Sequence, residues 1–177
     1  MTNFKLRPFN IYDLDILVSN ANNIKIAKYM TDKFPHPYSK EDGMNFIKFA
    51  TKDDPIHIFA IDIDGEASGG IGIHPQDDVF RKNAELGYWL AEKHWGKQII
   101  SRAIPQMVEF GFKTYDIDRI FARPYGNNLA SQRVLEKNGF KLEGRFEGNV
   151  LKNGERLDEL IYGIRKGTEN FDIRTND

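Results

Sequence analysis

The sequence predicts an α/β (α+β) fold in which a mixed, twisted β-sheet is flanked by helices. Three features favour this fold. Residues 83–140 read as strand, turn, long helix, strand and second helix. Residues 56–73 alternate apolar and polar positions around a central Asp-Gly pair, which is typical of a β-hairpin. Within the long helix, apolar residues recur at i, i+3, i+4 and i+7 over residues 100–111, which predicts one buried stripe.

Composition indicates one domain over residues 1–177 and excludes several classes of protein. Apolar residues make up 40% and charged residues 29%, the balance of a globular chain. A net charge of −1 gives no support for nucleic acid or an anionic membrane as a partner. Without cysteine there is no disulfide scaffold and no thiolate nucleophile, and the four histidines lack metal-ligand spacing. We expect no metal, no membrane-spanning run and a cytoplasmic location.

The elements before the hairpin have recognisable boundaries. The sequence predicts a strand over 4–7 and helices over 13–18, 24–30 and 40–50. Asn10 and Ser39 are residue types that cap helices, and Asp42 follows Ser39 at capping-box spacing. In the return strand of the hairpin, the pair Gly69-Gly70 indicates a bulge or a close approach to a ligand.

The second half of the chain completes the sheet. The sequence predicts strands over 84–90 and 118–123, a long helix between them, a helix over 128–138 and two last strands joined at Asn153-Gly154, followed by a polar tail after about residue 167. Asn128 is a good N-cap. Gly139 suits a left-handed residue after the helix, so that Phe140 folds back on Leu135. Pro105 should kink the long helix.

The turn at residues 93–98 is a candidate anion site. A helix that starts directly after a strand and a glycine-containing turn directs unpaired N–H groups and its positive dipole end at one point. Lys93, His94 and Lys97 surround Gly96 in this turn. The alternative is an ordinary turn with solvated lysines.

Several runs of sequence resemble one family over nearly the whole chain. They are AELGYWL, HWGKQII, NNLASQRVLEKNGF and NGERLDELIYGI, with KLRPFNIYDLD and DKFPHPYSKED near the start. These runs are similar to the GNAT acetyltransferases, and within them to the branch of ribosomal-protein N-terminal acetyltransferases and spermidine acetyltransferases.

The resemblance implies acetyl-CoA-dependent N-acetylation of a primary amine, on a small molecule or a peptide N-terminus, by direct attack. Acetyl-CoA and the amine acceptor are then the expected partners, and a homodimer stays open. The competing interpretation is a non-catalytic acyl-CoA-binding or regulatory protein of the same fold.

The resemblance also assigns cofactor contacts. Backbone amides at the start of the long helix would hold the pyrophosphate, and the pantetheine arm would follow the strand that ends at Leu90, whose N–H is the candidate oxyanion donor. The residues implied in cofactor binding are Leu90, Trp95, Gly96, Lys97, Gln98, Ile99, Ile100, Ser101, Asn128 and Ser131.

Catalysis requires a proton acceptor for the amine and a proton donor for the departing thiolate. Glu85 is the candidate base, because relatives carry a carboxylate in this strand; the alternative is a solvated strand residue or a partner for Arg81 or Lys82. Ser131 resembles the residue that protonates the thiolate, and the alternative is an ordinary first-turn serine. Tyr88 is a second candidate donor, although an aromatic residue on a core strand is more often simply packed.

On the acceptor side, the loop containing His36 and Tyr38 would form the wall opposite Glu85. The chain also departs from the family pattern, because Gln98 and Ile100 stand where relatives carry small residues. We expect the helix to begin one residue early, with Gln98 at negative φ in the first turn.

Overall fold

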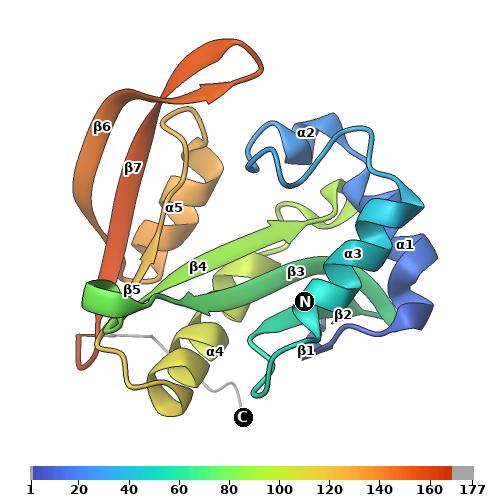
Figure 1. The fold of residues 1–177 in the computed structure, drawn as a ribbon, viewed down its shortest axis with the longest axis horizontal. Helices are drawn as coiled ribbons and strands as arrows, with labels where there is room; N and C mark the ends of the chain where they lie inside the picture. Colours follow the sequence, from blue (N-terminus) through green and yellow to red (C-terminus); the bar gives the residue numbers. More distant parts are fainter. Residues whose placement is uncertain (1, 169–177) are drawn as a thin grey trace.

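The computed structural model describes residues 2–168, which form one seven-stranded mixed sheet with helices on both faces (Figure 1). The strands are β1 (Lys5–Pro8), β2 (Ile58–Ile63), β3 (Glu66–Pro75), β4 (Asn83–Leu90), β5 (Arg119–Ala122), β6 (Lys141–Lys152) and β7 (Glu155–Arg165). The helices are α1 (Leu14–Ala21), α2 (Ile24–Ala27), α3 (Lys40–Ala50), α4 (Ile99–Thr114) and α5 (Leu129–Lys137). The predicted fold class is confirmed. The predicted polar tail lies outside the described residues, apart from its first residue.

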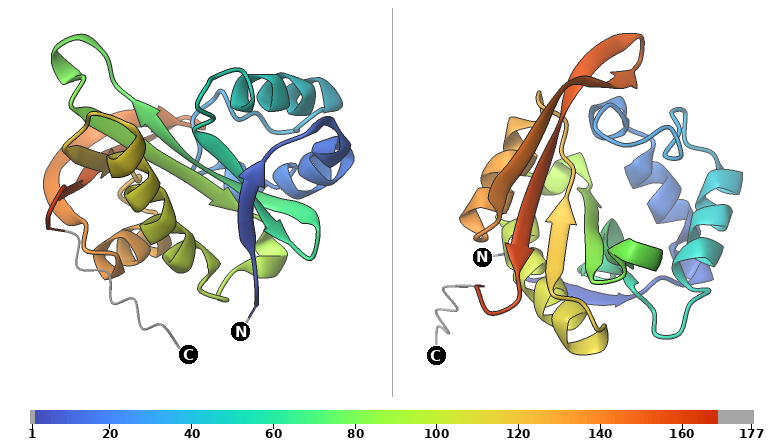
Figure 2. Two further views of the ribbon diagram at one scale, coloured as in Figure 1. Left: turned by 90° about the horizontal axis from the view of Figure 1, so that it is seen from below. Right: turned by 60° about the vertical axis from the view of Figure 1, so that its left-hand side comes forward.

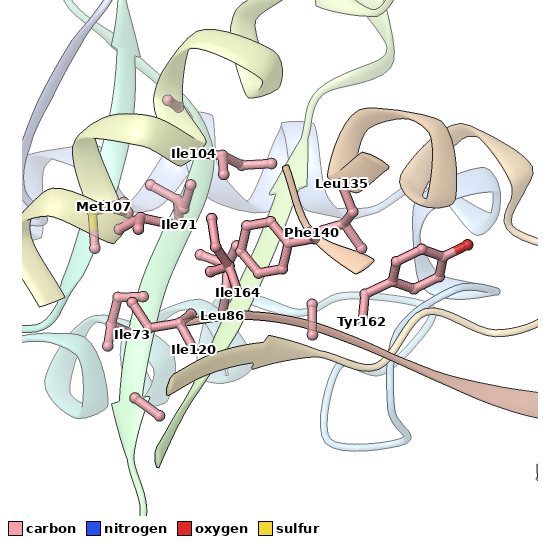
Figure 3. Packing of buried hydrophobic residues seen from close by; sticks show 14 of the residues in the cluster. Ile71, Ile73, Leu86, Ile104, Met107, Ile120, Leu135, Phe140, Tyr162 and Ile164 are labelled. Atoms are coloured by element: carbon pink, nitrogen blue, oxygen red, sulfur yellow. The ribbon is translucent and has the colours of Figure 1, made fainter. Parts of the chain in front are cut away.

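Two hydrophobic cores lie on opposite faces of the sheet. Helices α4 and α5 cover one face, and α1, α2 and α3 cover part of the other (Figure 2). The larger core joins the apolar stripe of α4, which includes Ile104 and Met107, to inward-facing residues of β3, β4, β5 and β7. Figure 3 shows Phe140 beside Leu135 and Ile164 in this core. The helices therefore fix the sheet from both sides.

The strand order is β1-β2-β3-β4-β5-β7-β6, and every neighbouring pair is antiparallel except β4 and β5. This single parallel pair joins the two halves of the sheet. Its register runs from Asn83 opposite Arg119 to Glu85 opposite Phe121 and ends there, whereas β4 continues beside β3 to Leu90. Beyond Glu85, β4 thus pairs with β3 alone within residues 2–168.

The β2–β3 hairpin has the predicted turn. Asp64 and Gly65 both adopt positive φ, 54° and 88°, as a tight hairpin requires. The register moves from Ala60 opposite Gly70 to Asp62 opposite Ala67, so β3 carries one extra residue there. The bulge predicted near Gly69-Gly70 is therefore present. A Cβ on Gly69 would lie 2.5 Å from the Trp89 carbonyl oxygen, so that position requires glycine.

The predicted capping residues of the helices are confirmed, whereas some predicted helix lengths are not. Asn10 accepts from the Tyr12 N–H, and Ser39 forms the predicted capping box with Asp42. Gly139 has φ 78°, and the Phe140 N–H donates to the Leu135 carbonyl at 3.1 Å, as in a Schellman ending. Helix α1 extends three residues beyond the predicted end at residue 18 and α2 stops three before residue 30, because capping signals mark starts better than ends. Helix α4 is continuous through Pro105.

A buried charge cluster ties β1 to β2 and to the start of α1. Arg7 donates to both carboxylate oxygens of Asp13 at 2.7 Å and to Asp62 at 2.5 Å. The Asp13 and Asp62 side chains are only 6% and 5% exposed. Burial raises the pKa of Asp62, but hydrogen bonds from Arg7 and from the Gly65 N–H outweigh it and hold that pKa below its ordinary value. The guanidinium of Arg7 is therefore the cation that compensates the charge of both buried carboxylates.

We expect Arg7→Met to lower the free energy of unfolding by about 3–5 kcal/mol, because it leaves two buried carboxylates without their cation. The matched control is Lys40→Met, which removes a pair with Asp15 whose side chains are 70% and 80% exposed. That variant should change stability by less than about 0.5 kcal/mol. Urea unfolding of the three proteins checks this, and equal losses from both variants would contradict it.

Candidate functional site

The exposed edge of β4 beyond Glu85 is the centre of the candidate site. Gln76 N–H donates to the Asn83 carbonyl and Ala91 N–H to the Ser68 carbonyl, so the odd-numbered residues of β4 direct their backbone groups at β3. Backbone groups of successive strand residues point to opposite edges. The N–H groups of Tyr88 and Leu90 therefore face the edge that β5 leaves unpaired. An extended ligand can bond there as an added strand does.

The turn before α4 presents a second set of backbone donors. Residues Gly96 and Gln98 have φ 73° and 58°, and α4 begins at Ile99 with Gln98 as its N-cap. The Gln98 side chain makes no capping hydrogen bond within the described chain, and the first helical bond is Arg102 N–H to the Gln98 carbonyl. The N–H groups of residues 99–101 therefore project from the helix start without intrahelical partners. This is the geometry of an anion site.

The prediction that Gln98 lies at negative φ in an early first turn is wrong. The residue is left-handed, although this conformation costs an ordinary side chain about 1–2 kcal/mol. The reason lies in packing: α4 starts at Ile99 and buries Ile99, Ala103 and Ile104 against the sheet, and Gln98 takes the left-handed conformation at the turn that leads into this start. The turn thus keeps its shape without the expected glycine.

Side-chain charge adds less to this turn than the sequence suggests. Lys93 is bonded to Glu66 at 2.8 Å. Burial, followed by repulsion from Lys97 and Lys93, lowers the pKa of His94, so its ring is neutral at pH 7. The Trp95 indole N–H donates to the Leu90 carbonyl at 2.8 Å and fixes the turn on the end of β4. Backbone amides, with Lys97 nearby in sequence, are the main source of positive potential.

On the face of the sheet that α4 and α5 cover, three predicted residues meet. The hydroxyl groups of Tyr88 and Ser131 are 2.7 Å apart, and the Asn128 side-chain oxygen caps the Ser131 N–H at 3.2 Å. Burial raises the pKa of Tyr88, and the bond with Ser131 only partly offsets this, so the phenol stays protonated. The structure therefore brings both candidate proton donors into one hydrogen-bonded pair, with the Asn128 amide nitrogen still able to donate.

Glu85 lies on the opposite face of the sheet, as strand alternation requires. Its partner is Arg123, which donates to both carboxylate oxygens at 3.0 and 2.8 Å, and Arg123 also lies 3.5 Å from Glu159. The alternative pairing with Arg81 or Lys82 is wrong, because Lys82 binds Asp116 and Arg81 donates to its own turn. The hydrogen bond from Arg123 to Glu85 is the main cause that raises the pKa of Arg123.

The two predicted acceptor-wall residues differ in exposure. His36 is exposed and lines a pocket of about 250 Å³. Tyr38 is 5% exposed, and burial followed by the charge of Asp42 raises its pKa to about 12. Its ring packs on Phe34, at 5.0 Å between centroids, and Phe34 packs on Trp89 of β4 at 5.7 Å. Tyr38 is therefore not one of the pocket-lining residues, but it contacts Phe34, which is.

Two pairs of charged residues at this site escaped prediction. Arg123 reaches Glu85 only because β4 and β5 are parallel and in register at residues 85 and 121, which sequence spacing does not reveal. Lys152, at the end of β6, bonds Asp32 in the loop after α2, 120 positions away. The one available signal was the lysine directly before the Asn-Gly turn of the last hairpin.

No group of three or more His, Cys, Asp or Glu residues able to hold a metal ion occurs within residues 2–168. In the same range, none of the helices is both long enough and apolar enough to cross a membrane.

The chain matches the family model of the acetyltransferase (GNAT) domain over residues 3–141. It is 36% identical over 104 residues to the uncharacterized N-acetyltransferase YoaA of Bacillus subtilis (strain 168), which covers 59% of this chain and 58% of that protein. It is 34% identical over 103 residues to the putative ribosomal N-acetyltransferase YdaF of the same organism, covering 58% of this chain and 56% of that one. The matches therefore span a little over half the length of these relatives.

Among solved structures, the fold resembles RimL, a ribosomal α-N-protein acetyltransferase in complex with coenzyme A. The TM-score is 0.83 at 21% sequence identity, over 96% of this chain and 97% of that one. At this identity the likeness concerns the fold.

The geometry of the turn before α4 predicts opposite effects for two substitutions. Gln98→Gly should raise the free energy of unfolding by about 0.5–1 kcal/mol, because relief of the left-handed conformation exceeds the added chain entropy of glycine. Gly96→Ala should lower it by about 1 kcal/mol, since φ is 73° and a Cβ there meets no atom within 4 Å, so strain alone acts. Denaturant unfolding measures both, and destabilisation by Gln98→Gly would refute the assigned turn.

Proposed function

We propose that this chain, which belongs to the acetyltransferase (GNAT) family, transfers the acetyl group of acetyl-CoA to a primary amine by direct attack, with no covalent enzyme intermediate. The observation that carries the proposal is the unpaired edge of β4 lying in sequence directly before the uncapped start of α4. Together they offer backbone donors to a long ligand with amides at one end and phosphates at the other.

The donor set fits acetyl-CoA, which supplies an activated acetyl thioester. The N–H groups of residues 99–101 would hold the pyrophosphate at the positive end of α4. The edge of β4 at Tyr88 and Leu90 would pair with the pantetheine amides, and the Asn128 amide nitrogen would add a donor from α5. The change at Gln98 leaves these donors in place, because the turn keeps its left-handed geometry.

The two faces of β4 supply acid and base from opposite sides. The Leu90 N–H, on the unpaired edge, would donate to the thioester oxygen as negative charge develops there. On the α5 face, Ser131 would donate a proton to the sulfur and recover one from Tyr88, which burial keeps protonated and which would regain its own proton from solvent as coenzyme A leaves. Glu85, on the other face, would accept the proton of the attacking amine.

The ion pair with Arg123 sets how Glu85 works. The Arg123 guanidinium binds both carboxylate oxygens and holds the Glu85 side chain in one orientation. Each oxygen keeps a second lone pair, so Glu85 can still orient the amine or a water molecule while the proton passes to solvent. We infer that Glu85 orients the amine or a water molecule as well as accepting the proton.

The acceptor class is supported by the relatives, whose names include a putative ribosomal N-acetyltransferase. A peptide N-terminus is therefore our first choice and a small-molecule amine the second. The test measures thiol release from acetyl-CoA with a panel of N-terminal peptides, polyamines and aminoglycosides, with products identified by mass spectrometry. Acetylation at nitrogen supports the proposal. Tight coenzyme A binding in calorimetry without transfer to any amine would favour a non-catalytic binding protein.

Glu85→Gln should lower kcat by about 10²–10⁴-fold, the range for loss of a general base, and leave coenzyme A affinity nearly unchanged. The matched control is Glu143→Gln. Glu143 pairs with Arg119 of β5, as Glu85 pairs with Arg123 directly after that strand, and its side-chain exposure is 32% against 27% for Glu85. Steady-state kinetics on both variants separates a role at the reacting amine from a structural ion pair. Equal rates for the two variants would remove Glu85 from the chemistry.

A further inference from the structure

A pocket lies between α2, the loop after it and the tip of the β6–β7 hairpin. Its volume is about 250 Å³, and α2 supplies an apolar wall through Ile24 and Ala27. The polar lining comes from Asp32 and His36 on the loop and from Lys152 and Asn153 at the hairpin. In Figure 1 the hairpin tip and α2 face one another at the top of the molecule.

The one ion pair in this pocket is unequal in burial. Lys152 is 8% exposed, and its Nζ donates to Asp32 Oδ1 at 2.7 Å. The Asp32 side chain is 86% exposed. A buried ammonium needs an anionic or hydrogen-bonding partner at all times, whereas an exposed carboxylate loses little by turning to water. The cation is therefore fixed, and its present partner is replaceable.

The pocket adjoins the face of β4 that carries Glu85. Phe34 lines the pocket and packs on Trp89, which points to the same side of β4 as Glu85. The Tyr125 hydroxyl, from the segment after β5, donates to the Met30 carbonyl at 3.3 Å and joins this wall to the sheet. The pocket and Glu85 therefore lie on the same side of β4, and we infer that a molecule held beside Glu85 extends towards the pocket.

We propose that Lys152 recognises a carboxylate on the acceptor, so that the enzyme prefers peptides with an acidic residue close to the N-terminal amine. This rests on the proposed acetyl transfer and names its acceptor class. When such a peptide binds, its carboxylate takes the place of Asp32 on the Lys152 ammonium, and the apolar wall at α2 contacts the chain between the two groups.

The same geometry disfavours a polyamine. A second ammonium in the pocket would pair with the exposed Asp32 carboxylate, and such a pair adds little because water already solvates that carboxylate. The same ammonium would also be repelled by the fixed positive charge of Lys152. An acidic group gains a charge-assisted hydrogen bond with a buried donor instead.

A latch is the rival explanation, in which the Lys152–Asp32 bond only holds the hairpin to the loop. The two explanations predict different effects of substituting Asp32 on the preference for acidic peptides. A latch is broken equally by removing either partner. An anion receptor is destroyed by Lys152→Met and improved by Asp32→Asn, because the second variant removes the competing carboxylate.

The test uses N-terminal alanine peptides, amidated at the C-terminus, with glutamate at position two, three or four, each with a glutamine twin. Wild-type kcat/KM should favour the best glutamate peptide over its twin by roughly tenfold, the effect of one hydrogen bond to a charged group. Lys152→Met should bring that ratio towards one, and Asp32→Asn should raise it several-fold. Lys33→Met, which removes a lysine from the same loop, controls for net charge and should leave the ratio unchanged.

Binding gives a readout that does not require turnover. Calorimetry of the same peptides with the coenzyme A complex should show the same order of affinities in the same variants. If acetyl transfer fails but the acidic preference and its opposite response to the two variants persist, the proposed function is wrong and the anion site stands. An absence of acidic preference in both readouts, or parallel losses in Lys152→Met and Asp32→Asn, overturns the proposal.

Discussion

The separation of β4 from β5 beyond Glu85 is the constraint on which the rest of the site depends. Strand β5 is four residues long, and the chain reaches Pro124 two residues after it. Proline has no N–H to donate to a ladder, and the Pro124 carbonyl accepts instead from Leu160 N–H of β7. The segment after β5 therefore stays with β7, while β4 stays with β3. The N–H groups of Tyr88 and Leu90 are left for a ligand, and such groups are costly to bury without a partner.

Strand alternation then divides the chemistry between two faces. Even-numbered residues of β4 place Tyr88 against Ser131, under α5. Odd-numbered residues place Glu85 beside Arg123 on the side of the helices α1 to α3. A hydroxyl and a carboxylate on one face would be free to hydrogen-bond to each other, whereas opposite faces keep them apart. The β-sheet period of two thus places the proposed acid and the proposed base on opposite faces of β4.

Local signals in the sequence predicted much of the fold. Capping residues Asn10 and Ser39, the Asp64-Gly65 turn and the ending at Gly139 each act through neighbouring residues, and the structure confirms them. The apolar stripe of α4 was also predicted correctly, because the buried residues of a helix follow its periodicity.

The wrong or missing predictions concern interactions set by tertiary structure. Gln98 is left-handed because packing of α4 fixes the helix start and overrides the preference of its side chain. Arg123 pairs with Glu85 through strand register, and Lys152 meets Asp32 across 120 positions of sequence. Long-range pairs of this kind leave no local periodicity, so the sequence placed Glu85 correctly in the strand, but the ion-pair partners considered for it, Arg81 and Lys82, were wrong.

Amide hydrogen exchange with and without coenzyme A tests the central claim most directly. In the free protein, amides of Gly87 and Trp89 should exchange slowly, because they face β3, and those of Tyr88 and Leu90 should exchange fast. Saturating coenzyme A should slow Tyr88, Leu90 and residues 99–101 by about tenfold or more, since bound ligand gives these N–H groups partners. Binding proved by calorimetry with no added protection at these amides would contradict the account.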